Sequence, residues 1–387
     1  MTMRYTAEID GDLVSQSHAW NGLAHIHYNQ GDFTAMLNAA TQSEQVAWLV
    51  GADAELTQAL LYKGEAHLYL GDVELAAAAA NRALTISDRQ HNMTATTENL
   101  ALLSRIYIKS GRQNRAMLYL DEMADQLDLQ DLDPNVVAHN RAQRGQLYRS
   151  LEQYDKAGHE LIAALDLYRE LDAQAEIAAT LNQVAELARL RGSIEAAIPF
   201  YQDALDIAKA IGDDLAALTY RTNLAGALIA GGQLEEALSN LQQVLALAEN
   251  VSLVVKWVKR YQVYRYLAEI YLRQDELKLA LESAHRALNL TPKFGETAVQ
   301  GTIWRLLGQI AERKNENVQV DNQSYNAADC FAESLKLLQG LGTKRQQVLT
   351  LRAWAAYETG QGNPAQAQNL THQAAAIASQ LDMKLAV

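Results

Sequence analysis

Few residues in this sequence have the types and spacing that chemistry requires. His18, Asn21 and His25 share one face of an expected helix, at spacings of three and four residues. Two histidines leave a tetrahedral zinc site unfilled. His159-Glu160 begins like a zinc-protease motif, yet Ala163 stands where the second histidine belongs. We therefore expect no metal site.

Motifs for nucleophilic chemistry and phosphate binding are also missing. The sequence contains no Walker loop and no GxGxxG, GxSxG or EF-hand pattern. Cys330 is the only cysteine, so the chain has neither an intrachain disulfide nor a CxxC site. Cys330 is expected in the core of an amphipathic helix. We accordingly expect no catalytic residue and no cofactor, and predict that the protein is not an enzyme.

Composition and charge restrict the class of partner. The chain has 387 residues and a formal net charge of −13, which argues against binding to nucleic acid. Its N-terminus lacks the apolar region of a signal peptide, and no apolar run reaches about 18 residues. Only 4 prolines occur, which favours helix. These features predict a helical cytoplasmic protein that binds neither nucleic acid nor membranes.

Two registers of small residues indicate the elements that would position a binding site. Both recur about every 40 residues, and Gly or Ala at such positions lets paired helices approach closely. The register in the first helix of each pair is Ala24, Gly64, Ser104, Gly145, Ala185, Ala225, Ala268, Gly308 and Ala355. The register in the second helix is Met36, Ala76, Ala116, Ala157, Ala197, Ala237, Ala280, Ala328 and Ala367. The sequence thus predicts nine helix pairs.

These residues resemble the tetratricopeptide repeat (TPR). The resemblance rests on the W-x2-LG spacing of Trp304, Leu307 and Gly308, on Gly-Asp between helices, and on Ala83-Leu84 and its equivalents late in second helices. The longer period resembles the extended repeats of kinesin light chains, spindle-orientation adaptors and the sensory tails of bacterial regulators. HEAT and armadillo solenoids share the period but lack this register. The resemblance implies an all-α, right-handed α-solenoid of about nine antiparallel helix pairs.

We predict a single TPR array over residues 1–387. Its repeats are expected at about 15–53, 54–93, 94–133, 134–174, 175–214, 215–254, 255–295, 296–342 and 343–387. Residues 1–14 are interpreted as the remnant of a preceding helix and its turn, and residues 315–323 as a polar, protruding inserted loop. Gly11, Gly31, Gly51 and Gly71 are expected to end helices as left-handed caps.

Neither end of the array shows an additional polar capping helix, which solenoids normally need for solubility. The end helices are then either amphipathic enough by themselves, or the chain is the repeat region of a longer protein or is covered at its ends by a partner. We favour the second interpretation, which includes self-association through uncapped ends.

The resemblance also implies that first helices line a concave groove. Groove residues are expected three before, one after and four after each small residue. The candidates are Asn21, His25, Arg105, Arg149, Asn182, Arg189, Arg265, Arg305 and Arg352. The last three hold one equivalent position in successive repeats, and arginine binds carboxylates bidentately, so an acidic peptide would suit them. Alternatively, Arg265 pairs with Glu269 and Arg189 with Glu186 on ordinary solvated helix faces.

The sequence therefore predicts a non-enzymatic scaffold whose groove binds a protein or a peptide, with an acidic partner favoured. The alternative prediction is a ligand-sensing regulatory region of a larger signalling protein, such as an ATPase, a cyclase or a transcription activator. The side chains between the small residues vary freely on a constant frame, so the pattern does not identify the partner.

Overall fold

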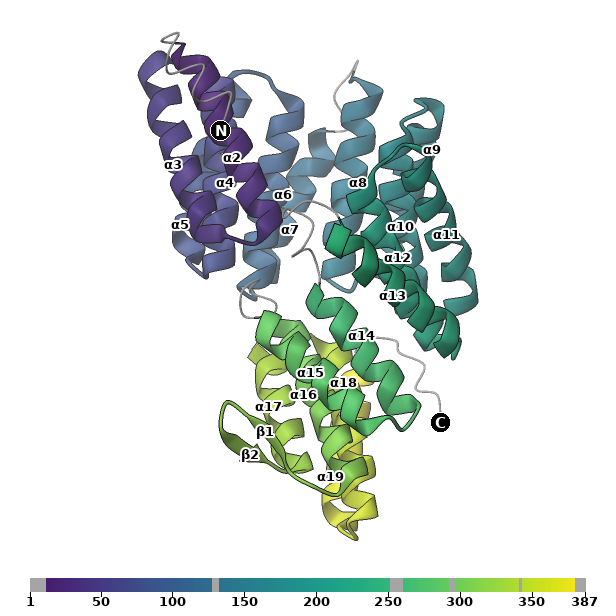
Figure 1. Ribbon diagram of the computed structural model, residues 1–387. Coiled ribbons are helices and arrows are strands. Elements are labelled where there is room, and N and C mark those ends of the chain that lie inside the picture. Colours follow the sequence, from purple (N-terminus) through teal and green to yellow (C-terminus); the bar gives the residue numbers. More distant parts are fainter. Residues whose placement is uncertain (1–11, 127–131, 251–259, 292–296, 341–342, 380–387) are drawn as a thin grey trace. The chain divides into compact units, whose positions relative to one another are not determined.

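The computed structural model describes residues 12–126, 132–250, 260–291, 297–340 and 343–379. Within these ranges the chain forms 18 helices in consecutive antiparallel pairs and one two-stranded sheet (Figure 1). The all-α solenoid of nine helix pairs predicted from the sequence is therefore confirmed. The chain divides into two compact units, an N-terminal unit of Met1–Tyr220 and Ala248–Val258 and a C-terminal unit of Arg221–Leu247 and Lys259–Val387.

The N-terminal unit contains five helix pairs. In chain order, its helices are α2 (Leu13–Gln30), α3 (Phe33–Val50), α4 (Asp53–Leu70), α5 (Val73–Arg89), α6 (Met93–Lys109), α7 (Gln113–Asp125), α8 (Pro134–Ser150), α9 (Tyr154–Glu170), α10 (Gln174–Leu190) and α11 (Ile194–Ala210). Leu13 and Val14 already belong to α2, whereas the sequence placed them in a remnant of a preceding helix. The rest of that predicted remnant, to residue 11, lies outside the described residues.

The sixth pair, α12 (Asp214–Ala230) and α13 (Leu234–Asn250), is divided between the two units. The C-terminal unit also contains the last three pairs. Its further elements are α14 (Arg260–Arg273), α15 (Leu277–Leu290), α16 (Thr297–Lys314), β1 (Val318–Val320), β2 (Gln323–Tyr325), α17 (Ala327–Gly340), α18 (Lys344–Gly360) and α19 (Pro364–Ala378).

Left-handed residues end the helices, as the regular glycines predicted. Gly31, Gly51 and Gly71 follow α2, α3 and α4 with φ of 70°, 66° and 91°. The backbone N–H of Gly31 and of Gly51 returns to the last turn of its helix, which satisfies carbonyls that have no partner within the helix. His91 and Glu152 take the same conformation with φ of 53° and 60°. Helices therefore end at the same regular intervals even where a residue other than glycine occupies the left-handed position.

The two registers of small residues meet where paired helices cross. A Cβ added to Gly64 would lie 3.3 Å from the carbonyl oxygen of Ala76, and one added to Gly145 would lie 3.3 Å from that of Ala157. In the third pair, Ser104 Oγ donates to the carbonyl of Ala116 at 3.3 Å. All residues of the first register are buried. These crossings are close because the residue facing the partner backbone has little or no side chain.

The eighth pair departs from the predicted register. Ala328 is only half-buried, although its equivalents in the other pairs are buried. Here a close crossing lies at Gly301, whose added Cβ would be 3.3 Å from the carbonyl of Ser334, and Ser334 Oγ donates to the Gly301 carbonyl at 2.6 Å. Phe331 fills the space opposite Gly308. The eighth pair thus packs closely at two positions on α16, Gly308 and Gly301, and Gly301 corresponds to Ser17, which contacts Ser43 in the first pair.

The insertion in the eighth pair is a hairpin, and the expectation of a protruding polar loop is wrong. β1 pairs antiparallel with β2, and Val318 lies opposite Tyr325. Val318 and Val320 are buried in the hydrophobic core beside Phe331, because alternate residues of a strand point to one face. Asp321 and Asn322 both have positive φ, as a two-residue hairpin turn requires.

The close crossings predict opposite effects for two Gly→Ala substitutions. In Gly308→Ala, the new Cβ would lie 2.7 Å from Cε1 of the fully buried Phe331 ring. We expect overpacking to outweigh the gain in helix propensity and to lower the free energy of unfolding by about 1–2 kcal/mol. Gly22→Ala is the control, since nothing lies within 4 Å of its Cβ, and it should raise that free energy by about 0.5–1 kcal/mol.

Urea unfolding followed by circular dichroism measures both variants. If Gly308→Ala were as stable as Gly22→Ala, the close approach of α16 to Phe331 would be contradicted.

Candidate binding face on the first helices

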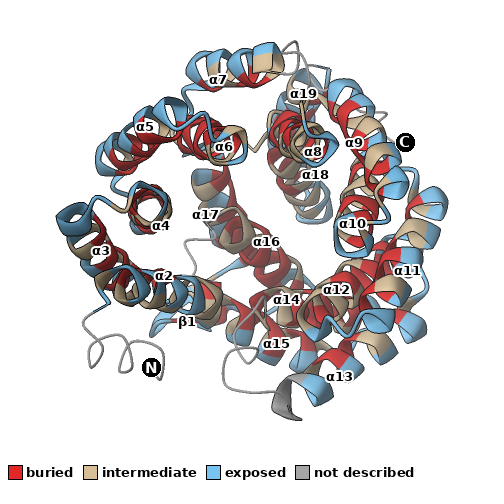
Figure 2. Cartoon of the chain, turned by 90° about the horizontal axis from the view of Figure 1, so that it is seen from above, coloured by how far each residue is buried: buried red, intermediate tan, exposed pale blue. Residues whose placement is uncertain are grey.

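The first helices of neighbouring pairs pack on one another within the N-terminal unit. α2 contacts α4, α4 contacts α6, α6 contacts α8 and α8 contacts α10. Viewed from above, α4, α6, α8 and α10 lie on the inner side of this unit, and α5, α7, α9 and α11 lie outside them (Figure 2). The first helices thus present a continuous inner face, and we call it the inner face below.

A cavity of about 500 Å³ opens on α2, α4 and α6. Among the residues that line it are Asn21 and His25 from α2, Glu55 and Tyr62 from α4, and Glu98 and Asn99 from α6. Two of the candidates chosen from the sequence, Asn21 and His25, therefore share this cavity. We call it the α2/α4/α6 cavity.

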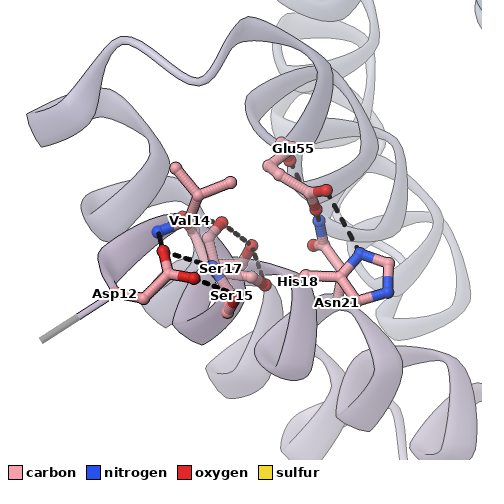
Figure 3. A network of polar contacts seen from close by, with 8 residues as sticks. Asp12, Val14, Ser15, Ser17, His18, Asn21 and Glu55 are labelled. Carbon is pink, nitrogen blue, oxygen red and sulfur yellow. Dashed lines mark hydrogen bonds and ion pairs between the residues drawn. The ribbon is translucent and has the colours of Figure 1, made fainter. Parts of the chain in front are cut away.

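One carboxylate joins α2 to α4 in this cavity (Figure 3). Asn21 Nδ2 donates to Glu55 Oε2 at 2.8 Å and to the Glu55 carbonyl at 3.0 Å, and His18 Nδ1 lies 3.2 Å from Glu55 Oε1. Asn21 is only 5% exposed, yet its Oδ1 has no hydrogen-bond partner among the described residues. An unsatisfied buried carbonyl of this kind costs about 1–3 kcal/mol, so it is a candidate acceptor for a ligand.

His25 is exposed at the rim of the cavity. Asn29 Nδ2 donates to His25 Nε2 at 3.1 Å, and the His25 ring lies 6.2 Å from the ring of Tyr62. Burial raises the pKa of Tyr62 to about 12 with the help of Glu65 and Glu98, so the phenol remains neutral and able to donate. These two rings give the cavity an aromatic wall.

Arg105 forms an ion pair between equivalent positions of successive repeats. Its guanidinium donates to Glu65 Oε1 at 2.7 Å, while its Nε has no partner. Burial alone would lower the pKa of Arg105, but the charge and hydrogen bond of Glu65 raise it. Burial, and the charge of Glu65, also raise the pKa of the neighbouring Glu98 carboxyl. Arg105 is thus engaged by Glu65, whereas no described residue forms such an ion pair with Glu98.

A second group of candidates lies on α8 and α10. Arg189 donates to both carboxylate oxygens of Glu186, at 2.8 and 2.6 Å, and Tyr201 donates to the same carboxylate at 2.6 Å. Burial would raise the pKa of Glu186, but these hydrogen bonds and the charges of Arg189 and Arg149 lower it to about 2. Arg149 is half-buried, and its Nε has no partner. Asn182 is half-buried on α10.

The arginines of the C-terminal unit lie in different surroundings. Arg265 lies 3.8 Å from Glu269 and 4.0 Å from the centroid of the Tyr266 ring. Arg305 donates to Gln346 at 3.0 Å, and its burial lowers its pKa to about 10, with Glu269 opposing and Arg265 adding to the shift. Arg352 is exposed on α18. The local pairs Arg265–Glu269 and Arg189–Glu186, weighed from the sequence as the alternative, are both present.

Several residues of the cavity were not among the candidates. His18, Gln58 and Glu98 lie six residues before the small residues Ala24, Gly64 and Ser104, one turn beyond the positions selected from the sequence. Extending the same face by one turn would have found them, because positions three and four residues apart share a helix face.

Neither a metal-binding cluster nor a membrane-spanning helix is found among the described residues. Across these ranges, no group of three or more His, Cys, Asp or Glu side chains is placed to hold a metal ion. None of the helices in the described ranges is both long enough and apolar enough to cross a membrane. Cys330 is fully buried in α17, where burial raises the pKa of its thiol to about 12. A thiol in that state is a poor nucleophile.

Comparison with known proteins relates this architecture to one family. Residues 136–210 and 176–250 match the family model described as Tetratricopeptide repeat. A structure of a Rap protein complexed with Competence and Sporulation Factor is 13% identical, covers 92% of this chain and 99% of its own, and has a TM-score of 0.65. No curated protein matches this chain.

Two further solved structures share the fold. The Rap conjugation gene regulator of the plasmid pLS20, in complex with the Phr* peptide, is 13% identical over 96% of this chain and 95% of its own, with a TM-score of 0.62. A Signal Transduction ATPase with Numerous Domains from Pyrococcus horikoshii, which has a tetratricopeptide repeat sensor, is 13% identical over 89% of this chain. The match covers 52% of the Pyrococcus chain, with a TM-score of 0.52.

The lowered pKa of Glu186 allows the polar network around this residue on the inner face to be tested. Its pKa of about 2 in the folded chain lies below the ordinary 4.5, so its stabilisation is complete above that value and is lost as pH falls towards 2. We expect Glu186→Gln to be less stable than the wild type by about 2–3 kcal/mol at pH 7, and this gap to shrink between pH 5 and pH 2.

Urea unfolding midpoints at pH 7, 4 and 3 measure the gap. Glu195→Gln, which changes an exposed carboxylate on α11, is the matched control and should leave the midpoint at pH 7 unchanged. A gap between wild type and Glu186→Gln that is the same at every pH would contradict the assigned network.

Proposed function

We propose, because the chain is a tetratricopeptide repeat protein, that it is a non-catalytic scaffold which binds a peptide or a protein segment on its inner face. The fold itself is typical of protein-binding scaffolds. The observation that carries the proposal is the α2/α4/α6 cavity, where three first helices present polar groups with unused hydrogen-bonding capacity. A bound segment would supply the missing hydrogen-bond partners. The free energy that the buried polar groups lose by lacking partners would then be regained on binding and contribute to affinity.

Two solved neighbours support a peptide as the ligand class. Both Rap structures were determined in complex, one with Competence and Sporulation Factor and one with the Phr* peptide. Both cover more than nine-tenths of this chain. A solenoid of this length offers an extended surface on which a short segment contacts several successive repeats. We propose that this chain, too, binds a peptide along several successive repeats.

The arginines on the first helices are proposed to contact acidic groups of the partner. Arg149 supports this because its Nε has no hydrogen-bond partner among the described residues. Arg189 and Arg265 already contact Glu186 and Glu269, so an acidic group would have to compete with those carboxylates. Arg305 is the least suited of the set, because it is half-buried and already donates to Gln346. Within the N-terminal unit, the proposed acidic contact therefore centres on Arg149.

The remaining parts of the proposal follow from the sequence. We propose a cytoplasmic protein that needs no cofactor, binds neither nucleic acid nor membranes, and has the capacity to associate with itself through its end helices. The net charge of −13 supports the part that concerns nucleic acid.

A second candidate function is a sensory region of a larger signalling protein. It is favoured by the likeness to the Pyrococcus horikoshii protein, an ATPase that carries a tetratricopeptide repeat sensor. Sequencing the complete transcription unit tests this candidate. An ATPase, cyclase or DNA-binding domain in the same reading frame would support it, and a reading frame that encodes this array alone would contradict it.

The proposed function predicts that peptides selected on the full chain bind its inner face. A phage-displayed library of random dodecapeptides is selected on the wild type, and enriched peptides are synthesised with a fluorescent label. We expect His25→Ala or Arg149→Gln to weaken binding at least about tenfold, the effect of losing one good contact. Arg169→Gln is the matched control, since Arg169 is exposed on the outer helix α9, and it should bind as the wild type does.

Fluorescence anisotropy gives the dissociation constants. A library that yields no enriched peptide would contradict peptide binding, and peptides that bind both inner-face variants as tightly as the wild type would contradict the proposed face.

A further inference from the structure

The α2/α4/α6 cavity has an unbalanced set of charges. Glu55 and Glu98 line it, and no lysine or arginine is found among its lining residues in the described part of the chain. Glu55 already accepts from Asn21 and His18. Glu98 takes part in no hydrogen bond or ion pair within the described residues, and it is half-buried. A carboxylate in this position lacks both a counter-ion and a donor.

Two buried amide carbonyls add acceptors to the same cavity. Asn21 is 5% exposed and Asn99 is 1% exposed, and within the described part of the chain the Oδ1 atom of each has no hydrogen-bond partner. The amide nitrogens are already used, since Asn21 Nδ2 donates to Glu55 and Asn99 Nδ2 donates to Ser87 Oγ at 3.5 Å. The unused capacity is therefore that of acceptors, and the complementary ligand is a donor.

Arg105 does not neutralise the cavity. Arg105 lies close enough to Glu98 to lower its pKa slightly, but burial and the charge of Glu65 together raise that pKa. The Arg105 guanidinium is bound to Glu65 at 2.7 Å. The field in the cavity thus favours an additional cation, and the acceptors around Glu98 favour one that carries several N–H groups.

We propose that the α2/α4/α6 cavity binds the cationic side chain of an arginine or a lysine in the peptide that the scaffold takes up. This inference rests on the proposed function and specifies its ligand. The guanidinium or ammonium donates to Glu98 and to the Asn21 and Asn99 carbonyls, and Tyr62 packs beside it as an aromatic wall. A volume of about 500 Å³ accommodates one such side chain with ordered water.

The proposed contact with a basic side chain changes the charge that we expect in the partner. The sequence alone suggested an acidic partner, from its arginines. The α2/α4/α6 cavity instead favours a basic side chain of the partner. Any acidic group of the partner would contact the arginines on other helices. A segment that is acidic along its length would therefore lack the group that this cavity takes.

The test is a double-mutant cycle between peptide and protein. The tightest peptide selected on the full chain is compared with analogues in which arginine is replaced by citrulline, or lysine by norleucine, each neutral and no larger than about the size of the original side chain. We expect neutralisation to weaken binding to the wild type at least about tenfold, and binding to Glu98→Gln at most about threefold. Glu74→Gln, on the exposed face of α5, is the matched control and should behave as the wild type.

The outcomes separate this inference from the proposed function. Failure to enrich any peptide contradicts the proposed function, and this inference with it. Enriched peptides without arginine or lysine, or neutral analogues that bind the wild type as tightly as the parent peptide, contradict the cationic cavity and leave the scaffold intact. A cycle in which Glu98→Gln and the wild type respond equally also contradicts it. Glu98→Gln should not lower the unfolding midpoint, because no hydrogen bond is lost and the carboxylate charge is disfavoured by burial.

Discussion

The close crossing of paired helices at small residues is the constraint on which the rest of the structure depends. Gly64 faces the Ala76 carbonyl, and Gly145 faces the Ala157 carbonyl, at distances that leave no room for a larger side chain. Because each crossing fixes how deeply two helices interlock, it also fixes which faces of the first helices remain outside the pair. Repetition of the crossing then places equivalent residues of successive repeats beside one another, as the ion pair between Glu65 and Arg105 shows.

This arrangement explains how a scaffold without catalytic machinery can carry a specific site. The second helices supply much of the buried alanine and leucine core, and the first helices are free to vary on their inner face. Along the N-terminal unit, that face is acidic and acceptor-rich at α2, α4 and α6, and bears Arg149 and Arg189 at α8 and α10. Such local charge segregation favours one peptide orientation over the reverse, since each charge meets its complement in only one direction.

The sequence predicted the frame well because the frame repeats. Gly31, Gly51 and Gly71 end helices, and the buried first register was predicted correctly from Ala24 to Ala355. The hairpin was missed because its signal is short. Val318 and Val320 alternate with Gln319 ahead of an Asp-Asn turn, yet the segment as a whole is polar.

The candidate site was less predictable because it depends on contacts between repeats. Spacing placed Asn21 and Arg105 on the inner face, but only the structure shows that Glu55 and Glu65 already bind them. The unused acceptor of Asn99 and the unpaired carboxylate of Glu98 likewise depend on what neighbouring helices fail to supply. A sequence lists donors and acceptors, whereas their satisfaction is a property of the packed array.

Photo-crosslinking tests the central claim, that the inner face holds a peptide, most directly. A selected peptide that carries a benzophenone is irradiated with the full chain, and the attached residues are identified by mass spectrometry. The account predicts crosslinks to the first helices, α2, α4, α6, α8 and α10, which are lost when unlabelled peptide competes. Crosslinks that fall mainly on the outer helices α5, α7, α9 and α11 would contradict it.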